Sequence, residues 1–136
     1  MVSNSALFDM NITQSSNHSI NKILIVDDDQ DIADMLQDFF SIEGYECKKM
    51  TSSLRALEIF DSDLDLLVTD LLMPEMNGVD LIKNIRKRVD GKQIKIIVMS
   101  GNAIFLKQDE INELRINIVL SKPTDLFKLS KIIKGL

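Results

Sequence analysis

The sequence predicts an α/β fold in which five parallel strands alternate with five helices, and helices cover both faces of the sheet. From Lys22 onward, short apolar runs alternate with segments whose apolar residues recur at helical spacing, which is the pattern of successive β-α units. The run at 66–69 is apolar on both sides, as a central parallel strand should be. A chain of 136 residues, 45% of them apolar, has the size of one such domain.

Each expected strand is a short apolar run, and the second is the weakest of them. The expected strands cover residues 22–26, 46–50, 66–69, 94–99 and 116–120. Short connections between strands that alternate with helices imply right-handed crossovers. No internal repeat is visible in the sequence. The pattern therefore predicts a single (βα)5 sandwich.

Each expected helix follows one strand and carries apolar residues three or four positions apart. The five stripes are Ile32, Leu36, Phe39 and Phe40; Leu54, Leu57 and Phe60; Leu81, Ile82, Ile85 and Val89; Ile104, Ile111 and Leu114; and Leu126, Leu129, Ile133 and Leu136. Gly44 and Gly91 favour the ends of the first and third helices, because glycine readily adopts left-handed backbone. The fourth stripe is thin, so that helix is the least strongly predicted.

Residues 1–21 are rich in Ser and Asn and have no sustained period. Such a segment buries too little apolar surface to order itself. We therefore expect a flexible N-terminal tail at 1–21 and the folded domain at 22–136. Leu7, Phe8, Met10 and Ile12 could instead form a short docking segment.

Composition excludes several classes of protein. The net charge of -5, from 21 acidic and 16 basic residues, argues against binding nucleic acid or an anionic membrane, because phosphates would be repelled on average. Cys47 is the single cysteine and cannot form an internal disulfide. No apolar run approaches the roughly 18 residues that span a bilayer, and the N-terminus does not resemble a secretory signal. We expect a cytoplasmic protein.

Polar residues gather where the expected strands end. In an open parallel sheet, ligands bind outside the carboxyl ends of the strands. The residues at those ends are Asp27, Asp28 and Asp29 after the first strand, Asp70 after the third, Ser100 after the fourth and Lys122 after the fifth. Carboxylates brought together repel one another unless a cation lies between them. Oxygen ligands suit Mg²⁺, and no His or Cys cluster offers a zinc site.

These groups together suit the transfer of a phosphoryl group. Asp70 could supply the nucleophile, while a metal ion and Lys122 neutralise charge and Ser100 donates a hydrogen bond. Taken singly, each residue has a simpler interpretation, since an aspartate after a strand can cap a helix and a lysine before proline can lie in a solvated turn. The basic group Lys83, Arg86, Lys87 and Arg88 is expected to be the solvated face of the third helix.

Four segments carry a resemblance to a known family. They are Ile-Leu-Ile-Val-Asp-Asp-Asp at 23–29, Val-Thr-Asp-Leu-Leu-Met-Pro-Glu-Met-Asn-Gly at 68–78, Val-Met-Ser-Gly at 98–101 and Leu-Ser-Lys-Pro at 120–123. In these segments the chain resembles the receiver domain of bacterial two-component response regulators. The resemblance covers about 22–136. It implies a flavodoxin-like three-layer sandwich whose five parallel strands have the order 2-1-3-4-5.

The resemblance also implies roles for individual residues. Asp70 would accept phosphate from a sensor histidine kinase or a histidine phosphotransfer protein, in a reaction that is not that of a dedicated enzyme. Mg²⁺ would be held by Asp27, Asp28, Asp70 and the backbone carbonyl of Leu72. Ser100 and Lys122 would contact the phosphoryl oxygens. Asp29 lies outside the metal-binding pair, so we expect it to be a cap or a solvated neighbour, and the Lys122–Pro123 bond is expected to be cis.

By the same resemblance, the fourth helix, fifth strand and fifth helix would form the face that binds a downstream protein, and two copies could pair through it. Val119 departs from the family pattern, which often has Tyr or Phe at this position. Valine cannot swing between exposed and buried positions with a comparable change in area. A receiver-like interaction module with weak or no phosphorylation-driven switching is therefore the alternative function.

Two further alternatives fit the residues less well. A phosphatase of the haloacid dehalogenase type needs an acid two residues after its nucleophile, and that position is Leu72. A flavin-binding module needs a phosphate loop after the first strand, where Asp27, Asp28 and Asp29 would repel the anion.

Overall fold

The computed structural model describes residues 19–88, 93–101 and 106–136. Its centre is a five-stranded parallel sheet with the order β2-β1-β3-β4-β5, as the resemblance implies. The strands are β1 (Lys22–Val26), β2 (Glu46–Met50), β3 (Leu66–Thr69), β4 (Lys95–Ser100) and β5 (Ile118–Ser121). The predicted strand order and helix alternation are therefore confirmed.

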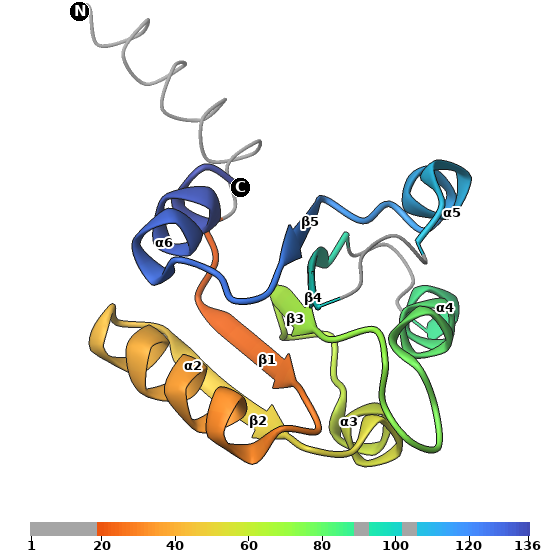
Figure 1. Cartoon of the computed structure of the whole chain (residues 1–136), viewed down its shortest axis with the longest axis horizontal. Helices are drawn as coiled ribbons and strands as arrows, with labels where there is room; N and C mark the ends of the chain where they lie inside the picture. Colours follow the sequence, from red (N-terminus) through yellow and green to blue (C-terminus); the bar gives the residue numbers. More distant parts are fainter. Residues whose placement is uncertain (1–18, 89–92, 102–105) are drawn as a thin grey trace, which may run out of the picture.

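Helices lie on both faces of the sheet and make three layers (Figure 1). They are α2 (Gln30–Ile42), α3 (Ser53–Ile59), α4 (Gly78–Arg88), α5 (Gln108–Glu113) and α6 (Leu126–Lys134). Figure 1 shows α2 and α6 on one face and α3, α4 and α5 on the other. The longest of these helices, α2, ends before Gly44, whose φ of 99° is the left-handed backbone expected after a helix.

The two faces of the sheet have separate cores, because neighbouring strand residues point to opposite sides. On the α2 and α6 face, Ile23, Ile25 and Val68 pack with Leu36 and Phe40 in one buried cluster. On the other face, the buried cluster joins alternate strand residues to α3, α4 and the chain around α5; it includes Leu24, Leu67, Val98, Ala56, Leu81, Ile85 and Leu114. Burial on both faces explains why the central strands are almost wholly apolar.

Some boundaries differ from the predicted ones. β4 begins one residue later than expected and includes Ser100, and β5 begins at Ile118, two residues later than expected. The amide of Ile116 still donates to the carbonyl of Ile111 in α5. α3 buries Ser53 and Ala56 rather than Leu54, and Phe60 follows the helix in extended backbone. Val89, Gly91 and Ile104 lie outside the described residues.

The basic group on α4 is not a uniformly solvated face, so that expectation is wrong for Arg86. Its guanidinium is half-buried and donates to three backbone carbonyls. Arg88 also donates to a carbonyl, that of Leu57, at 2.6 Å. Periodicity alone cannot reveal this arrangement, because the accepting carbonyls belong to other elements of the fold.

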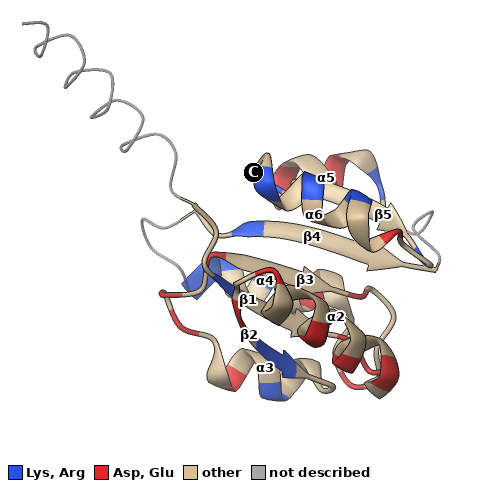
Figure 2. Ribbon diagram, turned by 90° about the vertical axis from the view of Figure 1, so that its left-hand side faces the viewer, with Lys and Arg blue, Asp and Glu red and all other residues tan. Residues whose placement is uncertain are grey.

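All five strands point the same way, so their carboxyl ends share one edge of the sheet. Figure 2 shows the strands side on, with acidic ribbon at the start of α2 near the edge to which the arrowheads point. The Lys122–Pro123 peptide bond at this edge is cis, as expected. Among the described residues, no helix is both long and apolar enough to cross a membrane.

Candidate functional site

The chain after β1 presents three consecutive aspartates in three different ways. Asp27 is 3% exposed, and its Oδ1 accepts a hydrogen bond from the amide of Asp29 at 3.0 Å. Asp28 is exposed. Asp29 is the N-cap of α2, because its side chain accepts from the amides of Asp31 and Ile32, which confirms the expected capping role. Only the first two aspartates are therefore available to the edge of the sheet.

Asp70 follows β3 directly and is 9% exposed. Its Oδ1 accepts from the amide of Leu71 at 2.7 Å, which fixes the orientation of the carboxylate. The loop after it turns tightly onto α4. An ideal Cβ on Gly78 would lie 2.1 Å from the backbone oxygen of Asp70, so only glycine fits the first position of α4.

Lys122 links two of the carboxylates. Its Nζ donates to Asp27 Oδ2 at 2.6 Å and to Asp70 Oδ2 at 2.9 Å. Lys122 directly follows β5, and its backbone amide donates to the carbonyl of Ser100 at 3.0 Å. Residues 95 positions apart in sequence are thus brought into direct contact by the sheet.

Asp27, Asp28 and Asp70 each place one carboxylate oxygen within 4.8 Å of the others. With Lys122 in contact, three carboxylates and one ammonium leave two negative charges, which one divalent cation would balance. An all-oxygen donor set with an exposed member fits Mg²⁺, which prefers oxygen ligands and usually keeps several waters. The residues present therefore fit the ion that the sequence suggests.

The pKa values of this group reflect burial and pairing. Burial raises the pKa of Asp27, and the hydrogen bond from Lys122 offsets only part of that effect. Burial by itself would lower the pKa of Lys122, but the hydrogen bonds to Asp27 and Asp70 outweigh it and raise that pKa. Lys122 is therefore charged at neutral pH and supplies a fixed positive charge beside Asp70.

The two other candidate residues lie on neighbouring segments of the same edge. Ser100 is buried at the end of β4 and pairs in register with Ser121 on β5. Leu72 lies two residues after Asp70 and is 54% exposed. Because a leucine side chain has no ligand atom, only the backbone carbonyl of Leu72 could serve a metal site.

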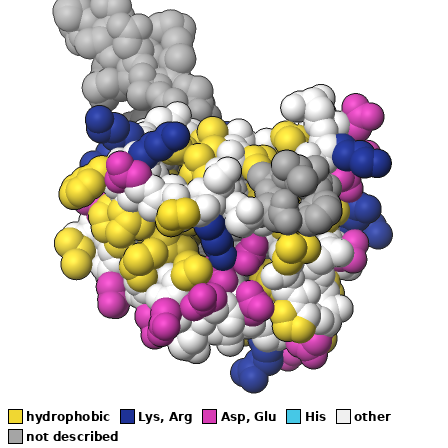
Figure 3. All heavy atoms as spheres, in the orientation of Figure 1, with side chains coloured by type: hydrophobic (Ala, Val, Ile, Leu, Met, Phe, Trp, Pro, Cys, Tyr) yellow, Lys and Arg dark blue, Asp and Glu magenta, His cyan; other side chains and the backbone are white. Residues whose placement is uncertain are grey.

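Sequence reasoning missed an apolar groove that adjoins Lys122. It has a volume of about 400 Å³ and is lined by Ile32, Met35, Met99, Lys122, Pro123 and Thr124. Figure 3 shows hydrophobic side chains gathered over the side of α2 and α6, beside an acidic group in the middle of the face. Met35 on α2 lies outside the predicted apolar stripe and is 44% exposed, but one apolar residue outside a stripe does not indicate a groove.

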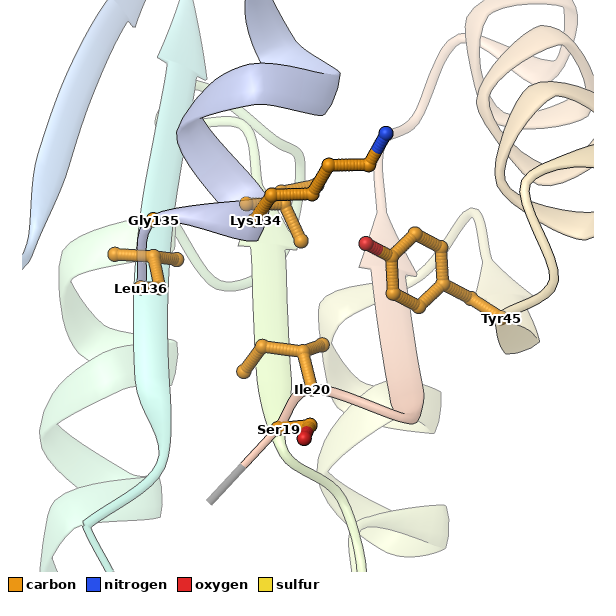
Figure 4. A pocket seen from close by; sticks show the side chains of 7 residues that line it. Ser19, Ile20, Tyr45, Lys134, Gly135 and Leu136 are labelled. Carbon is orange, nitrogen blue, oxygen red and sulfur yellow. The ribbon is translucent and has the colours of Figure 1, made fainter. Parts of the chain in front are cut away.

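A second hollow lies at the opposite edge of the sheet (Figure 4). Its volume is about 320 Å³, and its walls include Ile20, Tyr45, Ile133 and Leu136. Ile20 precedes β1 and Tyr45 precedes β2, so these residues lie at the amino ends of the strands. The carboxylates and Lys122 lie at the carboxyl ends, and this hollow is therefore separate from the candidate site.

Comparison with known proteins gives one consistent family. The family described as "Response regulator receiver domain" matches residues 23–134. Among curated proteins, the response regulator SaeR of Staphylococcus aureus is 42% identical over 66 residues, which are 48% of this chain and 29% of that protein. The match thus spans under a third of that relative's length.

Solved structures agree on the fold. A CheY-like receiver domain from Methylobacillus flagellatus has a TM-score of 0.75 and 28% identity, covering 86% of this chain and 98% of that one. The response regulator TrrA of Thermotoga maritima, solved in complex with Mg²⁺-BeF, has a TM-score of 0.73 and 26% identity over 85% of this chain and 98% of its own.

Proposed function

Because the chain belongs to the response regulator receiver domain family, we propose that it accepts a phosphoryl group on Asp70 from a histidine kinase or a histidine phosphotransfer protein. The observation that carries this proposal is the contact of Lys122 with Asp27 and Asp70 at the carboxyl edge of the sheet. A charged lysine beside a carboxylate is suited to transfer of a phosphoryl group between proteins.

In the proposed reaction, an oxygen of Asp70 forms a bond to phosphorus while the bond from phosphorus to the donor nitrogen breaks. The nitrogen keeps the electron pair of the broken bond, and the imidazole leaves in its neutral form because its other ring nitrogen carries a proton. Lys122 then holds a phosphoryl oxygen, and the hydroxyl of Ser100 donates to another. The amide of Leu71, which already donates to Asp70, keeps the carboxylate oriented.

Mg²⁺ would be held by Asp27, Asp28, Asp70 and the backbone carbonyl of Leu72. Its chemistry is to neutralise charge on the phosphoryl oxygens. The supporting observations are the all-oxygen donor set within 4.8 Å and the presence of Mg²⁺-BeF in the TrrA structure.

The test is incubation with acetyl phosphate, with and without Mg²⁺, followed by intact mass measurement. We expect the mass of one phosphoryl group to be added only with Mg²⁺, and the product to be sensitive to hydroxylamine. Asp70→Asn should abolish the addition. Asp28→Asn should reduce it sharply, whereas Asp29→Asn should preserve it, because asparagine caps a helix as well as aspartate does.

Hydroxylamine-sensitive phosphate on Asp70→Asn would show that another residue is the acceptor. Equal losses in Asp28→Asn and Asp29→Asn would contradict the proposed metal ligands.

We propose that the phosphodonor protein packs an apolar helix into the groove lined by Ile32, Met35 and Pro123. The groove adjoins Lys122, and Lys122 contacts Asp70, so a protein that presents a phosphohistidine to Asp70 must cover this surface. Met35→Glu should slow transfer from a phosphorylated histidine kinase but leave the reaction with acetyl phosphate unchanged. Ile42→Glu, on the same helix but outside the groove, is the matched control.

On the output side, we propose that a downstream protein, or a second copy of the chain, binds the face made by α5, β5 and α6. Phe127 on α6 is 78% exposed, and an aromatic side chain so exposed is suited to a protein contact. Val119 on β5 is half-buried against the α3, α4 and α5 core, and its short side chain makes a large swing impossible. We also propose a cytoplasmic location, where a histidine kinase obtains its phosphate from ATP.

A further inference from the structure

The helix α5 is attached to the molecule mainly through its two ends. None of its residues from Gln108 to Glu113 is fully buried, and its single apolar residue, Ile111, is only partly buried against the core. The buried side chains are Leu106 just before the helix and Leu114 just after it, and both belong to the core beneath. A helix held in this way can pivot about whichever end is fixed more firmly.

The C-terminal end is held by polar contacts to two other elements. Arg86, in the last turn of α4, donates from Nε to the carbonyl of Leu114 at 2.8 Å and from Nη2 to that of Arg115 at 2.9 Å. Its Nη1 donates to the carbonyl of Ile94 at 2.9 Å. One planar guanidinium thus joins α4, the end of α5 and the start of β4, a geometry that lysine could not reproduce.

The chain just beyond α5 is also tied to β4. The side-chain oxygen of Asn117 accepts from the backbone amide of Ile96 at 2.8 Å. The backbone amide of Asn117 donates to the carbonyl of Ile96 at 2.9 Å. The positive charge of Arg86 in addition faces the negative end of the helix dipole. The C-terminal end of α5 therefore has contacts on two sides.

The N-terminal end has a different environment. Among the residues that the structure describes, the hydrogen bonds of its first turn are local, such as that from the amide of Lys107 to Glu110 Oε1 at 3.2 Å. Between this turn and the start of α4 lies a hollow of about 290 Å³, lined by Leu71, Leu72, Asn77, Val79, Asp80, Lys83 and Glu110. Figure 1 shows α4 and α5 side by side on one face of the sheet. The two helices are joined at their C-terminal ends and separated by open space near their N-terminal ends.

The hollow also touches the phosphoacceptor loop, because Leu71 and Leu72 directly follow Asp70. We propose that Arg86 is a positioning residue that fixes the C-terminal end of α5, so that phosphorylation of Asp70 displaces only the N-terminal end of that helix. This inference rests on the proposed function, since it takes phosphorylation of Asp70 as its trigger. Arg86 acts through α5 and does not touch the reacting atoms.

Hydrogen exchange of the full chain in Mg²⁺, with and without beryllofluoride as the phosphoryl mimic, tests the proposal. The reporters are amides with known partners: Lys107 and Ile111 at the start of α5, and Leu114, Arg115 and Ile116 at its end. In the wild type, beryllofluoride should change exchange at the first pair only. In Arg86→Met, we expect exchange at the last three to be roughly tenfold faster and to become sensitive to beryllofluoride.

Arg88→Met is the matched control, because Arg88 lies on the same helix but donates to Leu57 on α3. It should behave as the wild type does at α5. Arg86→Lys keeps the charge but cannot reach all three carbonyls, and it should give an intermediate pattern even if Arg86→Met does not fold. A merely structural role for Arg86 would speed exchange equally with and without beryllofluoride.

Equal beryllofluoride effects at both ends of wild-type α5 would overturn the proposal, as would an unchanged pattern in the Arg86 variants. Binding of beryllofluoride is measured separately by fluorine NMR, with Asp70→Asn as the blank. Absence of binding to the wild type would overturn the proposed function and this inference with it. Binding without the asymmetric response would overturn this inference alone.

Discussion

Lys122 shows why one residue type is needed at the centre of this site. Its compact ammonium reaches two carboxylates that follow different strands, at 2.6 Å and 2.9 Å. Arginine would spread its charge over a planar group suited to a single carboxylate held by two hydrogen bonds. Breaking the pair by removing the lysine would leave Asp27 and Asp70 buried beside each other, which is costly in proteins. The lysine therefore holds the site together before any phosphate arrives.

Cys47 gives a residue-scale prediction about reactivity. Burial, with a smaller effect of Glu46, raises the pKa of this thiol to about 11. Because the thiolate is the reactive form, labelling by a disulfide reagent near pH 8 should be on the order of a hundredfold slower than for a cysteine in an unstructured peptide. The rate should rise steeply with pH. Labelling of the native chain as fast as that of the urea-unfolded chain would contradict the burial of this side chain.

Arg115 gives a second residue-scale prediction, this time about stability. Its φ is 56°, a left-handed conformation that strains any residue with a Cβ. Arg115→Gly should raise the free energy of unfolding by about 0.5–1 kcal/mol, measured by urea denaturation. Its backbone carbonyl still accepts from Arg86. Arg115→Ala removes the charge but keeps the Cβ, so its free energy of unfolding should rise less than that of Arg115→Gly. An equal rise in the two variants would show that the effect comes from the charge instead.

At the scale of elements, the sequence predicted what depends on local pattern. All five strands and five helices were expected, because apolar runs and 3.6-residue stripes are properties of neighbouring residues. The boundaries of β4 and β5, and the buried face of α3, were shifted because contacts from other segments decide them. The role of Arg86 and the groove at Met35 could not be predicted, since both depend on distant elements. The metal-binding role of Asp28 and the capping role of Asp29 were distinguished only by the resemblance. Residue type alone does not show which of two adjacent aspartates caps the helix.

The contact between α2 and β2 gives an element-scale prediction about pH. Lys49 on β2 donates to Asp34 on α2, and this hydrogen bond is the main cause that lowers the pKa of Asp34 from 3.8. A lowered folded-state pKa contributes stability above pH 3.8 that is lost as the pH falls through the folded value. Asp34→Asn should therefore be slightly less stable than the wild type at neutral pH, by urea denaturation, and equally stable in acid.

The effect should be small because the pair lies at the surface. Asp38→Asn removes the same charge from the same helix and is the matched control for the loss of charge alone. A difference between wild type and Asp34→Asn that grows on acidification would contradict the pairing.

At the scale of the whole molecule, folding gathers several carboxylates at the carboxyl edge of the sheet. Their mutual repulsion lowers the free energy of unfolding. Folding brings Asp70 to the neighbouring Asp27 and Asp28, so that one carboxylate oxygen of each lies within 4.8 Å of the others. In the unfolded chain Asp70 is distant from that pair, and all three carboxylates are hydrated. A cation bound there therefore favours the folded state, and the site and the stability of the domain become linked.

Mg²⁺ should accordingly raise the melting temperature of the chain relative to a sample in EDTA. A ligand that binds only the folded state at a hundred times its Kd adds about 2.7 kcal/mol, which corresponds to a rise of roughly 10 °C for a domain of this size. NaCl at matched ionic strength should give a far smaller rise, because screening acts on all surface charges alike. Asp28→Asn should lose most of the rise and Asp29→Asn should keep it. An equal rise in all three chains would mean that Mg²⁺ binds elsewhere.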